Sequence, residues 1–556
     1  MEKKNFIKRI FTGRRGRQLK EYLTAYIFIA PATLLIFIFG IFPVFFALYV
    51  SLHRWRIVRA DMIGLANYVT AVGNLAYVVA FFLGLGALVG VYFLLKKTLK
   101  MQREYGDQPW LTILPGLLFA GVGFSFLNWF YHALPEVLDI GFKLRGLERD
   151  EIVFLDFLVD ALRAESVLPA WRTFRWIFLA AVVVSVIIYR LWRSRNNLIY
   201  QAYFAMTFLA LGIGIGLLYF TVQEVHAAYA AALSDGVDPG IWPQVITISS
   251  GVILLIAAWL IWSRAEKQQT SSGFWLHILS AVVLLIGGWV LIGELPAIIA
   301  GGDTKVWDGL KVTVFFSLGT VPLQLIISLF LSVLLFQKLI GSNVFRIIFF
   351  IPYVTPAIAS AAVFRQMFSN RQTAPVNMLL RSLGLPSQQW LFEPRGIFTL
   401  IADQLGMTIP AWAAGPSLAL TVIILHSIWT FVGYNTVIYL AGLANIPKEL
   451  NDSAEVDGAN SWHVFRHITF PLLSPTTYFL SLIGIIGTFK AFNTIWIFRS
   501  NLALGTTDTF SLVIFIEFFE KLRYGYASAM AFVLFGIILS LTLINNRIQG
   551  TRVFYG

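Results

Sequence analysis

Few groups of side chains in this sequence have the types and spacing that chemistry requires. Asp156 and Asp160 are one helical turn apart, and two carboxylates so placed can act as acid and base. His463 and His467 have the same spacing, which suits two imidazoles on one metal ion. A solvated helix face with a local ion pair is the favoured interpretation of the aspartates, and the histidines lack a third ligand nearby. We therefore expect no metal site and no enzyme.

The sequence contains no G-x-x-x-x-G-K-[ST] motif, so we expect no ATP site and no cofactor on this chain itself. Gly84, Gly86 and Gly90 resemble part of a dinucleotide fingerprint, but they lie inside an apolar run with no strand before it. Small residues four apart allow two helices to approach closely in a membrane. This pattern predicts that Gly86 and Gly90 pack against a neighbouring helix.

The most informative polar stretch is 439–475, which interrupts two apolar runs. Pro447 suits the first turn of a short helix, where its missing N–H would be unpaired in any case. Gly458 can adopt the left-handed conformation that ends a helix. Asn460 or Ser461 can cap a second helix, which Pro471 would close before the next apolar run. The stretch therefore predicts a rigid helix–glycine–helix elbow suited to a docked partner.

The elements that carry these residues are membrane helices. The chain has 556 residues, of which 58% are hydrophobic and only 13% charged, against about 25% charged in soluble domains. A soluble enzyme and a nucleic-acid-binding protein are thereby excluded. Runs long enough to cross a bilayer predict an all-α polytopic membrane protein with about twelve spans, near 25–50, 74–95, 110–132, 174–192, 199–221, 243–262, 274–293, 312–336, 346–367, 417–442, 475–497 and 527–545.

Charge orients these spans. The first 23 residues are basic, and alternate loops carry Lys and Arg, whereas loop 222–242 carries only acidic charges. Basic loops stay in the cytoplasm, so both termini are expected there, in a cell-membrane protein. The net charge of +13 is interpreted as loop charge that orients the membrane helices and not as a sign of nucleic-acid binding. In the long outer loop 133–172, residues 150–165 predict an amphipathic helix at the membrane surface.

The elbow resembles the EAA loop of ABC-importer permeases, of the pattern E-A-A-x-x-x-G with I-x-x-P further on. Asp452, Ser453 and Ala454 occupy the E-A-A positions, with an acid one methylene shorter than glutamate and serine in place of the first alanine. Residues 440–450 resemble the L-A-G-L-x-x-I-P-x-E-L of the carbohydrate (maltose/glycerol-3-phosphate permease-like) group. Further matches are Gly458, Ile468 and Pro471 in the loop and the segments 30–32, 64–68, 346–356 and 524–530.

The resemblance implies a fold and a domain organisation. Residues 1–72 would hold the basic N-terminus and the first core helix, and 301–556 the rest of a six-helix type I importer core, with the EAA loop at 445–471. Residues 73–300 have no counterpart in the family pattern and would be an inserted membrane region of about six helices. An even number of inserted spans leaves the polarity of the core unchanged.

The resemblance also implies partners. Two ABC ATPase subunits would bind the ATP, a second homologous permease would complete a heterodimer, and an extracytoplasmic solute-binding protein would deliver a sugar, all in contact with membrane lipid. Asp452 would pair with a basic residue of the ATPase, while Trp462 and Phe465 would anchor the elbow. The residues expected to couple to the ATPase are Leu450, Asp452, Ser453, Ala454, Asp457, Gly458, Trp462, Phe465, Ile468 and Pro471.

Sugar contacts are expected near the membrane midplane, where polar side chains are costly and therefore candidates for function. Helix-to-helix hydrogen bonding is the alternative role for each of them. The candidates are His426, Trp429, Tyr434 and Asn435 in one span and Thr488, Lys490, Asn493 and Trp496 in the next. A self-contained secondary transporter remains the alternative function, although it would predict two similar halves, and no internal repeat is found.

Overall fold

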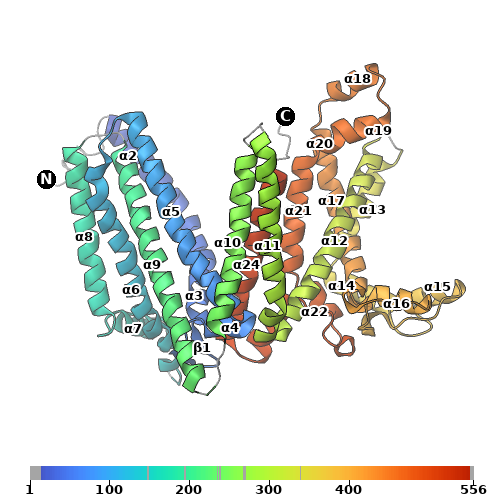
Figure 1. Cartoon of the computed structure of the whole chain (residues 1–556), viewed down its shortest axis with the longest axis horizontal. Helices are drawn as coiled ribbons and strands as arrows, with labels where there is room; N and C mark the ends of the chain where they lie inside the picture. Colours follow the sequence, from blue (N-terminus) through green and yellow to red (C-terminus); the bar gives the residue numbers. More distant parts are fainter. Residues whose placement is uncertain are drawn as a thin grey trace. The chain divides into compact units, whose positions relative to one another are not determined.

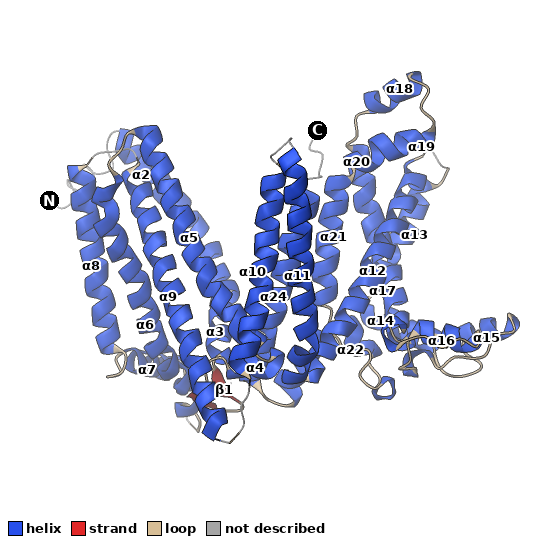
Figure 2. Cartoon of the chain, viewed as in Figure 1, coloured by secondary structure: helices blue, strands red, loops and turns tan. Residues whose placement is uncertain are grey.

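The computed structural model describes residues 14–146, 150–192, 196–234, 236, 240–266, 271–337 and 340–550. Most of them are helical, and the strands are confined to one short hairpin (Figure 2). The backbone forms two compact units, one of Met1–Gly73 with Leu295–Gly556 and one of Asn74–Glu294. We call these the first unit and the second unit. The predicted all-α polytopic fold is confirmed.

The described part of the first unit starts with one long helical segment. It consists of α2 (Arg14–Ile36), a π-helical turn η1 (Phe37–Ile41) and α3 (Phe42–Ser51). An antiparallel hairpin of β1 (His53–Trp55) and β2 (Arg59–Met62) follows, and then α4 (Ala66–Val72). Asn67 closes this corner, because its amide donates to the carbonyls of Ser51 at 2.8 Å and His53 at 3.0 Å.

After the second unit the chain returns to the first unit through a series of helices (Figure 1). These are α12 (Thr304–Phe336), α13 (Ser342–Val354), α14 (Ala357–Met367), α15 (Pro375–Ser382), η3 (Trp390–Phe392), α16 (Ile397–Gln404), η4 (Ala411–Ala413), α17 (Leu418–Ala444), α18 (Lys448–Val456), α19 (Ser461–Val464), η5 (Phe465–Thr469), α20 (Phe470–Leu472), α21 (Ser474–Phe489), α22 (Asn493–Phe498), η6 (Asn501–Ala503), α23 (Phe510–Phe515), η7 (Ile516–Glu520) and α24 (Tyr524–Gly550).

Helix α17 is the centre of the first unit. Its Leu420 and Ile423 pack with Phe316 of α12 in the main cluster of buried apolar side chains. The Ser328 hydroxyl of α12 donates to the Val432 carbonyl of α17 at 2.9 Å, which ties the two helices together. At Gly433 the backbone of α13 comes so close that a Cβ would lie 1.7 Å from the Phe349 carbonyl oxygen. Glycine is therefore required at that crossing.

Within the first unit, residues 396–417 form a segment whose two ends meet at an antiparallel bridge between Gly396 and Ser417. The bridge is reinforced because Ile397 N–H donates to the Pro416 carbonyl at 2.9 Å and Leu418 N–H to the Arg395 carbonyl at 3.0 Å. We call this segment the excursion; it carries α16 and lies at the end of the first unit opposite α18 (Figure 1).

The second unit is a bundle of long helices. It contains α5 (Leu75–Tyr105), η2 (Pro109–Thr112), α6 (Ile113–Lys143), α7 (Glu151–Leu162), α8 (Leu168–Leu191), α9 (Asn197–Ser234), α10 (Ile241–Ala265) and most of α11 (Ser271–Gly301). A buried polar chain links α8 to α9: Ser185 donates to Gln201 at 2.6 Å, and Gln201 donates to Asn197 at 2.6 Å.

The prediction for the glycines of α5 is wrong in its residues. A Cβ on Gly86 or Gly90 would meet nothing within 4 Å, so these two glycines permit no close approach. The close approach to α9 occurs at Gly84, where a Cβ would lie 3.2 Å from the Gly214 carbonyl oxygen. The sequence marks small residues on a helix, but only the rotation of the helix decides which of them faces a neighbour.

The predicted loop 133–172 is largely helical, because α6 runs on to Lys143 and α8 begins at Leu168. The short helix expected at 150–165 is present as α7 (Glu151–Leu162). Its Ile152, Leu155 and Val159 are exposed on one face. That spacing, with acidic residues between, is typical of a helix that lies at a membrane surface.

Among the described residues, ten helices are long and apolar enough to cross a membrane, and two bent pairs raise the count to as many as twelve. The span predicted at 346–367 is present as a bent pair of helices, because α13 and α14 meet at 93°. The residue before a proline avoids the helical region, and Thr355 before Pro356 is extended at ψ 134°. The span expected at 475–497 ends at Phe489 and is followed by the separate helix α22.

Candidate functional site

The first candidate site is the elbow formed by α18 and α19, which projects beyond the ends of α17 and α21 (Figure 1). Helix α18 starts after Pro447 and ends at Val456, with Asp457 as its C-cap, and Gly458 has a φ of +80°. Gly458 N–H donates to the Glu455 carbonyl at 3.0 Å and Ala459 N–H to the Ala454 carbonyl at 2.9 Å. This pair of bonds is a Schellman motif, so the left-handed cap predicted at Gly458 is confirmed.

The second arm of the elbow is capped by Asn460, whose side-chain oxygen accepts a hydrogen bond from His463 N–H at 2.9 Å. The second arm runs through a π-helical turn into α20 and ends at Leu472, so Pro471 lies in its last turn before α21, as predicted. Proline fits there since it occupies the start of α20, directly after the wider turn. The bend toward α21 comes at Leu473 and amounts to 59°.

The surface of the elbow is open and partly apolar. None of the residues of α18, α19, η5 and α20 is buried. Val456 is 88% exposed and Trp462 is 62% exposed. The rings of Trp462 and Phe465 stack with centroids 5.6 Å apart, and Phe470 continues the row at 6.1 Å from Phe465. An aromatic row beside exposed acids is typical of a protein docking surface.

The other predicted elbow residues lie on the same surface. Asp452, Ser453 and Asp457 are exposed, and the Ser453 hydroxyl donates back to the Glu449 carbonyl at 2.7 Å. Leu450 is exposed, whereas Ala454 and Ile468 are half-buried. Sequence reasoning missed Val456 and Phe470. A lone valine on an otherwise polar short helix is the signal that could have identified the first of them.

The predicted sugar-contact residues of α17 fall into two groups. His426 is 2% exposed, and its Nε2 lies 3.0 Å from the Ser360 hydroxyl of α14. Its ring meets Phe364 edge to face with centroids 4.9 Å apart, and Trp429 also contacts Phe364, at 5.3 Å. His426 and Trp429 therefore share one aromatic cluster, in which Trp429 is exposed and His426 is not.

Further along α17, Tyr434 stacks on Tyr353 of α13 with ring centroids 4.6 Å apart, while Asn435 is buried. Tyr353 was not among the predicted residues. Its position could not be read from the sequence because α13 meets α17 only through tertiary packing. The partly exposed Tyr434–Tyr353 pair offers aromatic faces to a ligand, whereas the buried Asn435 does not lie on that surface.

The predicted sugar-contact residues that follow the elbow also lie in different surroundings. Thr488 is buried, and its hydroxyl bonds Ser317 of α12 at 2.9 Å, which is a helix-to-helix contact. Lys490 and Asn493 are exposed at the break between α21 and α22. Trp496 packs against Phe492 and Phe515, with centroids 5.8 Å and 5.2 Å away. Trp496 and its two phenylalanines thus form a second aromatic group.

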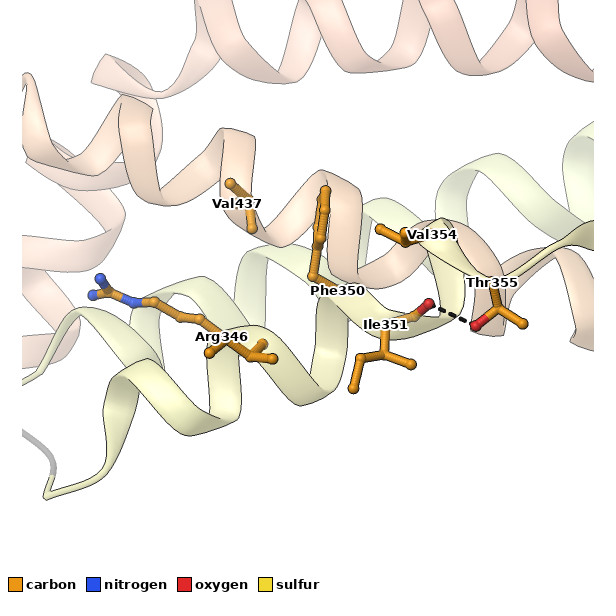
Figure 3. A pocket seen from close by; sticks show the side chains of 7 residues that line it. Arg346, Phe350, Ile351, Val354, Thr355 and Val437 are labelled. Carbon is orange, nitrogen blue, oxygen red and sulfur yellow. Dashed lines mark hydrogen bonds between the residues drawn. The ribbon is translucent and has the colours of Figure 1, made fainter.

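An apolar groove runs along α13 beside α17 (Figure 3). It holds about 480 Å³, and in Figure 3 Phe350 extends from α13 toward Val437 of α17. Ile347, Ile351 and Val354 are exposed along it. In a membrane such a face must be covered by lipid tails or by another apolar helix. The remaining lining residues are Arg346 and Thr355.

Comparison with known proteins concerns mainly the first unit. Residues 297–551 match the family model of the binding-protein-dependent transport system inner membrane component. The arabinooligosaccharides transport system permease protein AraP of Bacillus subtilis (strain 168) is 31% identical over 253 residues, which cover 45% of this chain and 72% of that protein. The probable ABC transporter permease protein YesP of the same strain is 35% identical over 257 residues, covering 46% of this chain and 75% of that protein.

Among solved structures, the crystal structure of a bacterial alginate ABC transporter in complex with an alginate pentasaccharide-bound periplasmic protein is 21% identical. It covers 49% of this chain and 93% of that chain, with a TM-score of 0.38. The curated relatives are transport permeases and not enzymes. The chain therefore belongs to the family of binding-protein-dependent transport system inner membrane components, as a multi-pass membrane subunit of an ABC importer in the cell membrane.

Proposed function

We propose that this chain moves a sugar into the cytoplasm, and that a separate ATPase drives it through the elbow. The geometry of α18 is the observation that carries the proposal. A Schellman motif fixes one end of this short helix, and its exposed side chains project beyond the membrane helices. The proposal that the transported solute is a sugar is supported by the family, whose members include an arabinooligosaccharide permease.

The proposal includes several partners. Two ATPase subunits supply the energy, a second homologous permease covers apolar faces such as the α13 groove, and a solute-binding protein delivers the sugar. The cytoplasmic side is the side of α18. In Figure 1 the C-terminal end of α24 lies on that side of the first unit, which supports a cytoplasmic C-terminus. No cofactor is proposed on this chain, because the ATP belongs to the ATPases.

The coupling works as a lever in this proposal. Exposed Leu450, Val456 and Trp462 would enter a cleft of the ATPase, and Asp452 would pair with a basic side chain there. When ATP closes the ATPase pair, α18 moves, and α17 and α21 move with it because short connections join them to the elbow. His426, Trp429, Tyr434, Asn435, Thr488, Lys490, Asn493 and Trp496 remain the proposed sugar contacts.

The test is Gly458→Val. The φ of +80° at Gly458 is strained for a β-branched residue, at a cost of roughly 1–2 kcal/mol. We expect ATPase co-purification and ATP-driven uptake to fall about tenfold, whereas Gly458→Asn, which tolerates this conformation, should keep most of both. Uptake is measured in membrane vesicles with the ATPase, the second permease and the binding protein present.

Gly384→Val is the matched control. Gly384 has a φ of +76°, and a Cβ placed on it, as on Gly458, would meet no atom within 4 Å. The two variants therefore carry a similar conformational cost at different places. Equal loss of uptake in both, or normal uptake and co-purification in Gly458→Val, would contradict the coupling role of the elbow.

A further inference from the structure

A charged cavity opens at the end of the first unit where α12 and α17 begin. It holds about 680 Å³, within the range of small-molecule sites. One face of α12 lines it with Lys305, Asp308, Val312 and Phe315, at the three- and four-residue spacing of a helix face. Leu420 of α17 lines it as well. The elbow follows the other end of α17, so this cavity lies at the end opposite α18.

Two ion-pair groups hold the far wall in place. The Arg499 guanidinium donates hydrogen bonds to both carboxylate oxygens of Asp508, at 3.2 Å and 3.3 Å. Glu517, which is 1% exposed, pairs with Lys521 at 2.5 Å and with Arg523. A carboxylate so deeply buried keeps its charge only when it is paired in this way. These side chains therefore give the wall fixed donors and acceptors.

The charged side chains on the α12 face differ from those of the opposite wall because they form no ion pairs among the described residues. Lys305, Asp308 and Lys311 are exposed, and in the part of the chain that the structure describes no oppositely charged atom lies within 4.0 Å of any of them. Below them the lining becomes apolar with Val312, Phe315, Leu420 and Ile516. The cavity thus has a rim of free donors and acceptors above an apolar floor.

This combination fits a sugar ring. A hydroxyl group both donates and accepts hydrogen bonds, so neighbouring ammonium and carboxylate groups can bind adjacent hydroxyls of one ring. The apolar floor matches the C–H face of the ring, which Phe315 can contact. A purely anionic ligand fits less well because Asp308 lies between Lys305 and Lys311 on the same helix face.

We propose that this cavity, which we call the vestibule, binds one or two rings of a neutral sugar before the sugar reaches the aromatic groups around His426. The inference rests on the proposed function and adds a binding step to it. Leu420 and His426 are six residues apart on α17, which is roughly 9 Å along the helix. Along α17, the vestibule therefore lies nearer than His426 to the end opposite α18.

The absence of cysteine from the chain makes a direct binding test available. In Lys311→Cys the single thiol lies at the rim, and its rate of alkylation by an uncharged maleimide is measured on the full chain in lipid nanodiscs. We expect arabinotriose or lactose to slow the reaction at least fivefold. Asp403→Cys is the control: Asp403 is exposed on α16 and does not line the cavity, so neither sugar should change its rate.

The outcomes separate cleanly. Slower alkylation of Lys311→Cys alone supports the vestibule. Equal rates with and without both sugars overturn it, and so does protection by galacturonate but by neither neutral sugar. Because alkylation requires neither ATP nor an ATPase, a failure of ATP-driven uptake would count against the proposed function and leave this result standing.

Transport supplies a second measurement. In the assembled importer, Asp308→Asn removes one charged hydrogen-bond acceptor from the rim without breaking an ion pair of the described residues. The loss of one such bond corresponds to about a tenfold rise in KM for uptake, with the maximal rate little changed. Asp403→Asn should leave KM unchanged. A KM for Asp308→Asn equal to that of the natural chain would overturn the proposal.

Discussion

Glu393 shows how a single side chain closes the base of the excursion. Its carboxylate is buried and accepts a hydrogen bond from Arg395 Nε at 3.0 Å, while Arg395 also reaches Asp403 at 3.3 Å. Hydrogen bonds from Arg395 hold the pKa of Glu393 below its ordinary value, although burial opposes the shift. Ala419 N–H donates to the Glu393 backbone carbonyl at 3.3 Å, so this residue links the excursion to the start of α17.

This lowered pKa predicts that the base of the excursion loosens in acid. A carboxyl whose pKa is lower in the folded state stabilises that state above its unfolded pKa, and the stabilisation is lost as pH falls through the folded value. We expect hydrogen-exchange protection of the Leu418 amide in the natural chain to decrease as pH falls below the ordinary pKa of a glutamate, about 4.3, and through the lower folded pKa of Glu393. In Glu393→Gln protection should be weaker at pH 7 and nearly independent of pH. The exposed Asp403→Asn serves as control, and an unchanged pH profile in Glu393→Gln would contradict the assignment.

Local sequence predicts some residues of the candidate site and not others. The cap at Gly458 and the side-chain cap at Asn460 depend on neighbours a few residues away, so the pattern of turn residues was sufficient. The surroundings of His426 were not predictable, since Ser360 and Phe364 reach it from another helix. The coupling role of Asp452 and the sugar contacts remain predictions.

Among the elements, the crossing of α13 and α17 depends on one glycine. A Cβ at position 433 would lie 1.7 Å from the Phe349 carbonyl oxygen and 2.4 Å from its carbon, and both are backbone atoms that cannot rotate away. Gly433→Ala must therefore push the two helices apart. Overpacking of this kind costs about 1–3 kcal/mol.

We expect Gly433→Ala to lower the thermal unfolding temperature of the detergent-solubilised protein and to disturb the stacking of Tyr353 on Tyr434. Gly487→Ala on α21 is the matched control, because a Cβ there would meet nothing within 4 Å. The measurement is the fraction of protein that remains monodisperse after heating, as determined by size-exclusion chromatography. Equal unfolding temperatures for the two variants would refute the close crossing.

Hydropathy predicts where apolar helices occur but not how they are interrupted. The break between α13 and α14 follows from Thr355 and Pro356, a local signal that a count of apolar residues ignores. The π-helical turns η1 and η5 lie inside continuous helices and η7 lies at the end of α23, and each is a shift in backbone hydrogen bonding that hydropathy does not reveal. The extension of α6 to Lys143 likewise exceeds the length that a bilayer requires.

For the whole molecule, the interpretation of 73–300 as an insertion remains a proposal. It is supported by the place where the chain leaves and rejoins the first unit. A Cβ on Gly73 would lie 3.2 Å from the backbone carbon of Gly301, and Asp303 N–H donates to the Thr70 carbonyl at 3.0 Å. The two ends of the segment between them are therefore neighbours.

We predict that a chain lacking 74–301, with Gly73 joined to Gly302, still inserts and behaves as a monodisperse protein. The segment contains six candidate spans, those of α5, α6, α8, α9, α10 and α11, so its removal leaves the direction of α12 unchanged. The readout is retention of Lys311→Cys alkylation from the side opposite the elbow.

Removal of 74–270 is the control, since it deletes five spans and leaves α11 in place. That odd number would reverse every helix that follows, and the control should misinsert or aggregate. Aggregation of both variants to the same extent would mean that the first unit depends on the second for its folding.

On the proposal that 73–300 is an insertion, the meeting of Gly73 with Gly301 has an evolutionary consequence. A segment whose two ends touch, and which crosses the bilayer an even number of times, can be gained or lost by a single genetic event without changing the topology of the permease around it. Lineages could therefore exchange this cassette while the ancestral transporter went on working.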